Sequence, residues 1–274
     1  MARIAVAATA PLGADVLERL AARHDVAFLL TRPDRPRGRG RRVGPPPAKE
    51  VAVRLGIPVR QPERLDGPLE LDDVETVIVA AYGALIPEEL LEEALWLNVH
   101  PSLLPRWRGA APVERAIMAG DRETGVTIHR TTAELDAGPI AAQRSFPIAP
   151  DDDAGTVYAR AGALAAELLE GVLSGTPGFR PQSEEGVTYA ERLTAVDREL
   201  DWSRPPEELL NRIRALSPHI GARGPVDGKL LTVWRAQPVG PDAALTADGL
   251  ELLEVQPEGR RRMTGEEYLR GLRG

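Results

Sequence analysis

Short apolar segments alternate with a helix-like segment at the start of the chain, and this order restricts the fold more than any other feature of the sequence. Ile4–Ala8, Ala27–Leu30 and Val74–Ala81 are largely apolar and have the length of strands, and Val16–Arg23 has a helical pattern. Strands joined through helices form parallel sheets that are buried on both faces. The sequence therefore predicts an α/β fold, in which Asp15 is expected to cap the first helix.

A strand that ends in polar residues precedes a proline-containing loop at residues 97–109, which read L-N-V-H-P-S-L-L-P-R-W-R-G. Leu97 and Val99 alternate with Asn98 and His100, as in a half-buried strand. Open α/β sheets place their sites at the carboxyl ends of strands. An Asn amide donates hydrogen bonds and a His titrates near neutrality, so the pair is a candidate site. The alternative, that the pair only holds the loop, stays open.

Two strands that are expected to pair, Thr124–Arg130 and Ile140–Phe146, flank a turn that contains Asp136. Asp-x-Gly is ordinary turn chemistry, so the residues alone do not separate a turn from a site. His129 lies within the first of these strands and is interpreted as a structural or substrate-lining residue. An amphipathic helix over Asp153–Leu173 would close the first domain.

The second half of the chain indicates a linker and a smaller domain. Residues 174–196 are rich in Gly, Pro, Ser and Thr. A helix up to Leu216, strands over Lys229–Trp234 and within Leu250–Val255, and a capping box at residues 264–267 follow. We predict a catalytic domain over residues 1–180, a linker over 181–199 and a C-terminal domain over 200–274.

Arginine is concentrated in one short segment of an acidic chain. Residues 32–42, R-P-D-R-P-R-G-R-G-R-R, carry a net charge of +5, whereas the remainder of the chain carries −12. Gly and Pro without hydrophobic periodicity predict a solvated, mobile loop between the second strand and a helix near Ala48–Leu55. Guanidinium groups pair bidentately with phosphate, so the loop is a candidate for nucleic-acid contact, although a solvated face would have the same composition.

Several classes of protein are disfavoured by what the sequence lacks. It has no Cys and only four scattered His, so neither a disulfide framework nor a metal site is expected. The turn after the first strand reads T-A-P-L-G and lacks the glycine fingerprint of dinucleotide-binding folds. No apolar run reaches 18 residues, and the first one is too short for a signal peptide. A cytoplasmic protein without membrane contact is expected.

Several motifs, in order, resemble those of the folate-dependent formyltransferases. Residues 98–112, N-V-H-P-S-L-L-P-R-W-R-G-A-A-P, resemble the family signature, as do G-V-T-I-H-R at 125–130 and L-D-A-G at 135–138. Residues 31–42 resemble the insertion loop of the methionyl-tRNA formyltransferases within this family, and 79–87, V-A-A-Y-G-A-L-I-P, resemble the pterin-binding stretch. The resemblance implies a Rossmann-like formyltransferase domain and a small, shortened, OB-like β-barrel domain that contacts tRNA.

The family's catalytic trio maps onto Asn98, His100 and Asp136. The resemblance implies that 10-formyltetrahydrofolate is the co-substrate and that the α-amino group of methionyl initiator tRNA is the acceptor. Asn98 would then donate to the oxyanion, and Asp136 would orient His100. Whether His100 or Asp136 takes the amine's proton stays open at this point. A monomer without a metal is expected.

The resemblance also implies two sets of binding residues. Those expected to contact folate or substrate are Tyr82, Gly83, Leu85, Ser102, Leu103, Leu104, Pro105 and Gly109. Those expected to contact tRNA are Arg35, Arg37, Arg39, Arg41 and Arg42. Arg106 and Arg108 either meet phosphate or pair with carboxylates inside the fold.

Two departures from the family pattern and two alternative functions remain. Ala8-Thr9-Ala10-Pro11 replaces a Gly-Thr-Pro turn, and the stretch between Ala236 and Leu253 is shorter than usual, which bears on how well the second domain grips tRNA. A UDP-amino-sugar formyltransferase would share the trio but has no need of the arginine loop. A non-catalytic folate- or RNA-binding relic has no reason to keep the trio.

Overall fold

The chain divides into two compact units in the structure, a computed structural model that describes residues 1–37, 42–67, 69–71 and 73–272. Unit 1 comprises residues 1–109, 125–146 and 158–189. Unit 2 comprises residues 110–124, 147–157 and 190–274.

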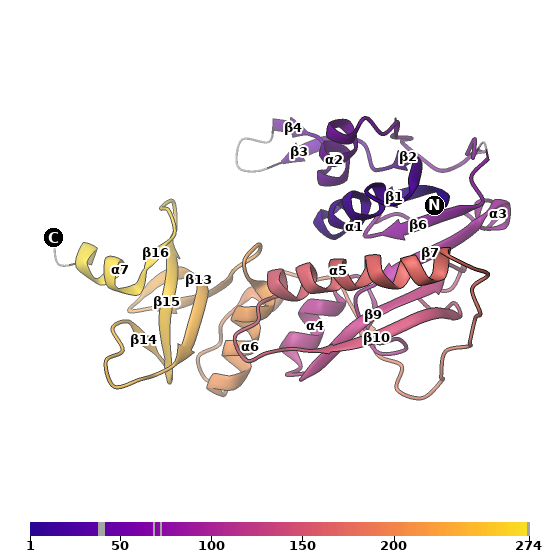
Figure 1. Ribbon diagram of the computed structural model, residues 1–274. Helices are drawn as coiled ribbons and strands as arrows, with labels where there is room; N and C mark the ends of the chain where they lie inside the picture. The colour runs from indigo at the N-terminus through magenta and orange to yellow at the C-terminus, as the bar shows by residue number, and fades with distance from the viewer. Residues whose placement is uncertain (38–41, 68, 72, 273–274) are drawn as a thin grey trace. The chain divides into compact units, whose positions relative to one another are not determined.

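Unit 1 is built on a mainly parallel sheet of seven strands in the order β10–β9–β7–β6–β1–β2–β5 (Figure 1). The strands are β1 (Arg3–Ala8), β2 (Asp25–Leu30), β5 (Val59–Arg60), β6 (Thr76–Ala80), β7 (Leu95–His100), β9 (Glu123–Arg130) and β10 (Ile140–Pro147). The strands from β5 to β7 are parallel, and β9 joins β7 in the antiparallel sense. The predicted α/β class is confirmed.

Helices cover both faces of this sheet, which explains why its central strands β1, β2 and β6 are largely apolar. The helices are α1 (Pro11–Ala21), α2 (Pro47–Leu55), α3 (Glu88–Glu93) and α5 (Ala154–Leu173). On one face, Phe28, Val79 and Trp96 form a cluster with Leu90 of α3. On the other face, α1 packs against β1, β2 and β6.

The first helix begins earlier than the sequence predicts, and the prediction that Asp15 caps it is wrong. Pro11 starts α1, because its ring fixes the φ angle that a first helical residue needs. The carboxylate of Asp15, one turn into the helix, instead accepts a hydrogen bond from Nε of Arg19 at 2.9 Å. Gly13 lets the helix approach the sheet closely, since a Cβ there would lie 2.3 Å from the carbonyl oxygen of Ala80.

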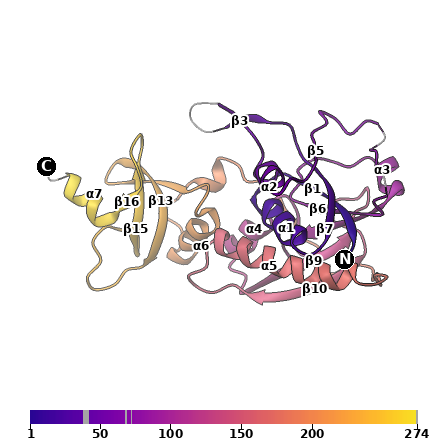
Figure 2. The same ribbon diagram turned by 45° about the horizontal axis from the view of Figure 1, so that its top comes forward.

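Part of the arginine-rich segment forms a hairpin, which the prediction of a loop missed. β3 (Arg35–Arg37) pairs with β4 (Arg42–Gly44) outside the main sheet (Figure 2). A two-stranded hairpin forms its backbone hydrogen bonds without an apolar face, so its sequence shows no hydrophobic pattern. At its base, the Asp34 carboxylate accepts hydrogen bonds from Lys49 at 2.8 Å and from Gln61 at 2.8 Å.

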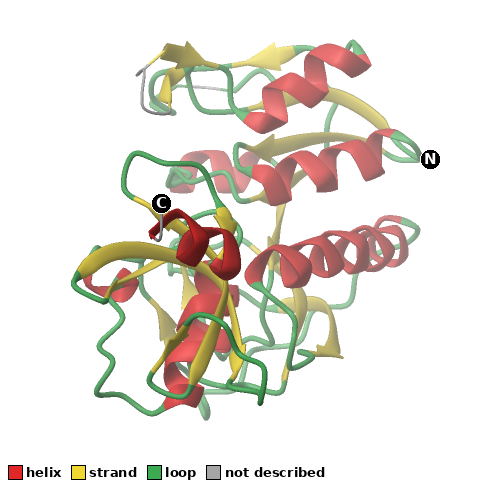
Figure 3. Ribbon diagram, turned by 90° about the vertical axis from the view of Figure 1, so that its left-hand side faces the viewer, coloured by secondary structure: helices red, strands yellow, loops and turns green. Residues whose placement is uncertain are grey.

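Unit 2 contains helices and a curled antiparallel sheet of five strands (Figure 3). Its helices are α4 (Pro112–Met118), the short 3-10 helix η1 (Val196–Arg198), α6 (Pro206–Leu216) and α7 (Gly265–Leu272). Its strands are β12 (Ala222–Val226), β13 (Lys229–Pro238), β14 (Thr246–Ala247), β15 (Leu250–Pro257) and β16 (Met263–Thr264). The predicted capping box is confirmed, because Thr264 and Glu267 exchange hydrogen bonds of 3.0 and 3.1 Å.

Among the residues that the structure describes, no helix combines the length and the apolar character needed to cross a bilayer.

The close approach at Gly13 predicts opposite effects for one substitution at two helical glycines. We expect Gly13→Ala to lower the free energy of unfolding by about 1–3 kcal/mol, because the added methyl group collides with backbone. We expect Gly171→Ala near the end of α5 to leave it unchanged or raise it by up to about 1 kcal/mol, because a Cβ there meets nothing within 4 Å. Urea unfolding of both variants measures this difference, and a Gly13→Ala protein as stable as Gly171→Ala would contradict the packing.

Candidate functional site

Asn98, His100 and Asp136 come together at the carboxyl end of β7. Asn98 and His100 are two residues apart in the strand, so their side chains leave the same face of the sheet. The register of β7 with antiparallel β9 sets His129 directly opposite Asn98 on that face. Asp136 comes from the β9–β10 connection, and its Oδ1 accepts a hydrogen bond from Nδ2 of Asn98 at 3.1 Å.

The hydrogen bonds of His129 fix its tautomer and the orientation of the Asn98 amide. Nδ1 of His129 lies 3.0 Å from the carbonyl oxygen of Arg130, which can only accept, so Nδ1 carries the proton. Nε2 is then the acceptor for Nδ2 of Asn98, 3.1 Å away. The Asn98 amide nitrogen therefore has an acceptor for each of its two protons, His129 and Asp136.

His100 is buried and presents a free basic nitrogen to Asp136. Its Nε2 donates to the carbonyl oxygen of Trp107 at 2.7 Å, so the neutral ring has an unprotonated Nδ1. That Nδ1 lies 3.6 Å from Oδ2 of Asp136. Burial lowers the pKa of His100 below its usual 6.5, and the nearby Asp136 carboxylate offsets this only in part. His100 is therefore neutral at pH 7.

Asp136 is ionised although its side chain is only 11% exposed. Burial raises the pKa of this carboxyl, but the imidazoles of His129 and His100, when they are protonated, and the backbone N–H of Gly109 lower it more, to about 2. The Gly109 N–H donates to Oδ2 at 2.8 Å. Asp136 itself has a φ of +49°, a left-handed conformation that Asp tolerates better than most residues.

The proline-containing loop after β7 is held by side chains from β9 and β10. Oγ1 of Thr127 donates to the Ser102 carbonyl at 2.7 Å and accepts from the backbone N–H of Leu104 at 3.1 Å. Gln143 donates to the Leu104 carbonyl at 2.9 Å. The Ser102 hydroxyl donates to the Arg106 carbonyl at 2.7 Å, so it serves the loop itself. The predicted binding residues Ser102 and Leu104 are buried, and Leu103 and Pro105 are half-buried.

A second segment, residues 182–188, supports the same loop, and sequence reasoning missed it. Oγ1 of Thr188 accepts a hydrogen bond from the backbone N–H of Trp107 at 2.9 Å. The backbone carbonyl of Thr188 accepts one from the backbone N–H of Arg108, also at 2.9 Å. Strand β8 (Arg108–Gly109) pairs here with β11 (Tyr189–Ala190). The side chain of Gln182 bridges Arg108 and the Asp136 turn. The composition of residues 182–188 is typical of a linker, so the sequence shows no signal for these contacts.

The other predicted folate contacts differ in exposure. The Tyr82 side chain is buried in the cluster of Phe28 and Trp96, and burial raises the pKa of its phenol. Gly83 is exposed and Leu85 is 86% exposed. Thr9, in the turn that departs from the family pattern, donates from Oγ1 to the Tyr82 carbonyl at 2.8 Å, so this turn still contacts the 82–85 segment.

The arginines fall into two groups. Arg108 is 8% exposed and its guanidinium contacts Gln182 and Glu134, so it pairs inside the fold, and Arg106 stacks on the Trp107 ring at 4.4 Å. Of the arginines expected to contact tRNA, Arg35 is exposed on β3, and the backbones of Arg37 and Arg42 pair with each other in the hairpin. Arg39 and Arg41 lie outside the described residues.

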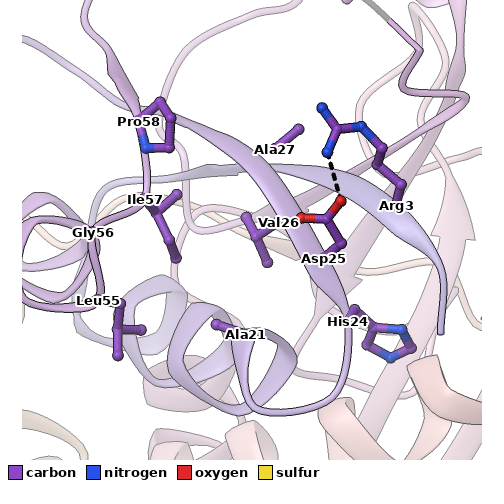
Figure 4. Close-up of a pocket in the computed structure, with 10 residues that line it drawn as sticks. All are labelled: Arg3, Ala21, His24, Asp25, Val26, Ala27, Leu55, Gly56, Ile57 and Pro58. Atoms are coloured by element: carbon purple, nitrogen blue, oxygen red, sulfur yellow. Dashed lines mark hydrogen bonds and ion pairs between the residues drawn. The ribbon is translucent and has the colours of Figure 1, made fainter.

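Two hollows lie in the described part of unit 1. One of about 360 Å³ is bounded by Glu88 and Glu92 of α3, by Arg130 at the end of β9 and by Thr132 of the β9–β10 connection, which also carries Asp136. The other, of about 420 Å³, lies at the amino ends of β1 and β2, the opposite edge of the sheet from Asn98 and His100 (Figure 4). Its charged side chains Arg3 and Asp25 pair with each other, and it shares no residue with the site.

Within the described part of the chain, no three His, Asp or Glu side chains gather as metal ligands would.

Comparisons of the sequence with known proteins identify both parts of the chain. The family model for formyl transferase matches residues 2–173, and the model for the formyl transferase C-terminal domain matches residues 192–273. A methionyl-tRNA formyltransferase of Methylococcus capsulatus is 39% identical and covers 97% of this chain and 96% of its own. One of Paracoccus denitrificans is 38% identical and covers 98% and 97%.

Solved structures share the fold at lower sequence identity. Methionyl-tRNA formyltransferase from Clostridium thermocellum matches with a TM-score of 0.67 and 17% identity over 94% of this chain and all of its own. HypX from Aquifex aeolicus, in complex with tetrahydrofolic acid, matches with a TM-score of 0.66 and 19% identity over 97% of this chain. The chain spans about half the length of HypX, at 46%.

The matches extend over both units of the chain, and the trio lies within the matched N-terminal region. The chain belongs to the formyl transferase family, and its full-length curated relatives are methionyl-tRNA formyltransferases.

Proposed function

We propose that the chain transfers the formyl group of 10-formyltetrahydrofolate to the α-amino group of methionyl initiator tRNA. The observation that carries the proposal is the contact between the ionised Asp136 carboxylate, the Asn98 amide and the unprotonated nitrogen of His100. An amide donor beside a base is the equipment that acyl transfer to an amine needs. The identity of the acceptor rests on the curated relatives.

The reaction joins the amine nitrogen to the formyl carbon and then breaks the bond from that carbon to N10 of the folate. As the amine attacks, the formyl oxygen gains negative charge and the nitrogen must lose a proton. When the tetrahedral intermediate collapses, N10 takes up a proton. The products are N-formylmethionyl-tRNA and tetrahydrofolate.

Asn98 is assigned as the donor to the developing oxyanion. Its amide is uncharged and carries two N–H donors, and one such hydrogen bond to an oxyanion is typically worth about 10²–10³ in rate. His129 and Asp136 hold the amide in one orientation before substrate binds. Because those two acceptors use both amide protons, one of the two hydrogen bonds opens when Asn98 donates to the oxyanion.

His100, rather than Asp136, is assigned as the proton acceptor, and two features of the site support this choice. A carboxyl group with a pKa of about 2 is a weak base, so Asp136 is poorly suited to take a proton from an ammonium group. Nδ1 of His100 is unprotonated and faces Asp136 at 3.6 Å. Asp136 thus stabilises the imidazolium that forms when His100 accepts the proton.

The binding residues follow the same proposal. The segment 82–85 and the loop 102–109 shape the folate and acceptor sites, and Arg35, Arg37, Arg39, Arg41 and Arg42 contact the phosphates of the acceptor stem. Residues 1–180 form the catalytic domain, 181–199 the linker and 200–274 the tRNA-binding domain. The enzyme acts as a monomer in the cytoplasm.

The test is formyl transfer from 10-formyltetrahydrofolate with charged initiator tRNA and a UDP-amino sugar offered together. We expect formylated tRNA as the only product, and we expect both Asn98→Ala and Asp136→Ala to lower the rate at least about 100-fold. If only the sugar is formylated, the acceptor is an amino sugar and the proposed tRNA acceptor is wrong. If either variant turns over at the wild-type rate, the substituted residue is not catalytic.

The low pKa of Asp136 predicts a pH-dependent contribution to stability. Its folded-state value of about 2 lies below the usual 3.8, so the ionised carboxylate stabilises the fold above about pH 5 and loses this effect as the pH falls toward 2. We expect Asp136→Asn to lower the free energy of unfolding by about 2 kcal/mol at pH 7, and by less at pH 3.5. Urea unfolding at the two pH values measures both differences. A difference that does not change with pH would contradict an ionised, stabilised Asp136.

The five arginines between residues 35 and 42 predict a salt-dependent effect on the tRNA substrate. We expect simultaneous substitution of the five arginines by Ala to raise KM for tRNA about tenfold or more. We also expect the log–log slope of KM against salt to fall by about one unit for each phosphate that an arginine no longer neutralises. The matched control replaces five other exposed arginines, each in an ion pair: Arg23, Arg54, Arg64, Arg144 and Arg204. Equal effects in the two variants would show that only net charge matters.

A further inference from the structure

The side chain of Gln182 has a partner at every hydrogen-bonding position of its amide. Nε2 donates to the carbonyl oxygens of Asp136 at 2.7 Å and Gly138 at 2.8 Å. Oε1 accepts from Nη2 of Arg108 at 2.8 Å and from its Nε at 3.1 Å. We propose that Gln182 is a positioning residue that sets Asp136 against Asn98 and His100. This inference rests on the catalytic role proposed for Asp136.

The outer side of the Asp136 turn is exposed to solvent, so the turn depends on a few specific contacts such as those of Gln182. Its neighbours are exposed, with the Glu134 side chain at 74% and Leu135 at 57%. Asp136 also occupies a left-handed conformation, which surrounding contacts must maintain. Gly138 lies so close to the end of β9 that a Cβ there would be 1.8 Å from the Arg130 carbonyl oxygen, so the turn has one narrow path.

Arg108 gives the Gln182 amide its direction. A guanidinium group only donates, so the atom that faces it must be Oε1, and Nε2 is thereby directed at the two carbonyls of the turn. Arg108 is itself fixed, since its side chain is buried and its backbone N–H donates to the Thr188 carbonyl at 2.9 Å. Gln182 thus transmits the position of Arg108 to the backbone of Asp136.

The neighbours of Arg108 in the chain touch the other members of the site. The carbonyl of Trp107 accepts from His100, and the N–H of Gly109 donates to the Asp136 carboxylate. Three consecutive residues therefore hold the site. Trp107 holds the His100 ring, Arg108 holds the Asp136 backbone through Gln182, and Gly109 holds the Asp136 carboxylate. The 3.6 Å separation of His100 Nδ1 and Asp136 Oδ2 depends on this arrangement.

Two substitutions separate positioning from simple stabilisation. In Gln182→Glu the carboxylate still accepts from Arg108, and more strongly, but it cannot donate to the two carbonyls and repels them. In Gln182→Met both halves of the interaction are removed. Gln237→Glu is the matched control, because Gln237 is an exposed glutamine of β13 whose amide contacts Glu251.

Formyl transfer to initiator tRNA and urea unfolding are measured for each protein. We expect Gln182→Glu to lower kcat roughly 10- to 100-fold, with KM for both substrates within about twofold and an unfolding midpoint like that of the wild type. We expect Gln182→Met to lower both kcat and the midpoint. Gln237→Glu is compared for stability alone, and we expect it to leave the unfolding midpoint unchanged. A wild-type kcat in Gln182→Glu would overturn the proposal. So would a lower kcat that is explained by a larger fraction of unfolded protein, as calculated from the urea unfolding curve.

Amide hydrogen exchange of residues 131–139 keeps this proposal separable from the proposed function. If the wild type transfers no formyl group to tRNA, the function fails, and positioning is then judged from exchange alone. Faster exchange of this segment in Gln182→Glu, with the remainder of unit 1 unchanged, supports the role of Gln182. Exchange equal to that of the wild type overturns it.

Discussion

A buried carboxylate is stable only where donors surround it, and Asp136 meets this requirement by drawing separate segments of the chain together. Its two oxygens accept hydrogen bonds from the Asn98 amide and the Gly109 N–H. Leaving such a charge without these partners would cost several kcal/mol. The end of β7, the proline-containing loop and the β9–β10 connection thus meet at the Asp136 carboxylate. The ionised state of this carboxylate depends on all three segments.

The antiparallel placement of β9 beside β7 makes this convergence possible. A further parallel strand would have sent its carboxyl end past His100 and away from the interior of the sheet. The antiparallel register instead sets His129 opposite Asn98, so the chain leaves β9 beside Trp96, where the N–H of Thr131 donates to the Trp96 carbonyl at 2.8 Å. The connection must then return along the face that carries Asn98 and His100, and this return brings Asp136 to them.

The sequence predicts those parts of the structure that depend on local pattern. Apolar runs and the alternation at residues 97–100 predict the sheet, its strands and the shared face of Asn98 and His100. The role of Asp136 followed from the family resemblance, because Asp-x-Gly by itself is turn chemistry. The contacts of Gln182 and Thr188 had no local signal, since each joins residues far apart in the sequence. The contact of His100 with the Trp107 carbonyl spans only seven residues, but its acceptor is a backbone carbonyl, which every residue type carries. The hairpin was missed for a related reason, because backbone pairing between charged residues leaves no periodicity.

The hydrogen bonds that stabilise the resting site are also the ones that the proposed reaction would rearrange. Both protons of the Asn98 amide have acceptors before substrate arrives, so donation to an oxyanion exchanges one hydrogen bond within the protein for one with the substrate. Such an exchange costs little when the new acceptor carries more charge than the old one, as an oxyanion does compared with the ring nitrogen of His129. The hydrogen bond with His129 is therefore the one to open. In the proposed reaction the hydrogen bond with Asp136 is then retained, and the carboxylate stays in place to stabilise the imidazolium of His100. In the proposed reaction the neutral formyl oxygen of the substrate is a poorer acceptor than the oxyanion, so it replaces the His129 nitrogen less favourably. The preorganised amide thus stabilises the transition state more than the bound substrate.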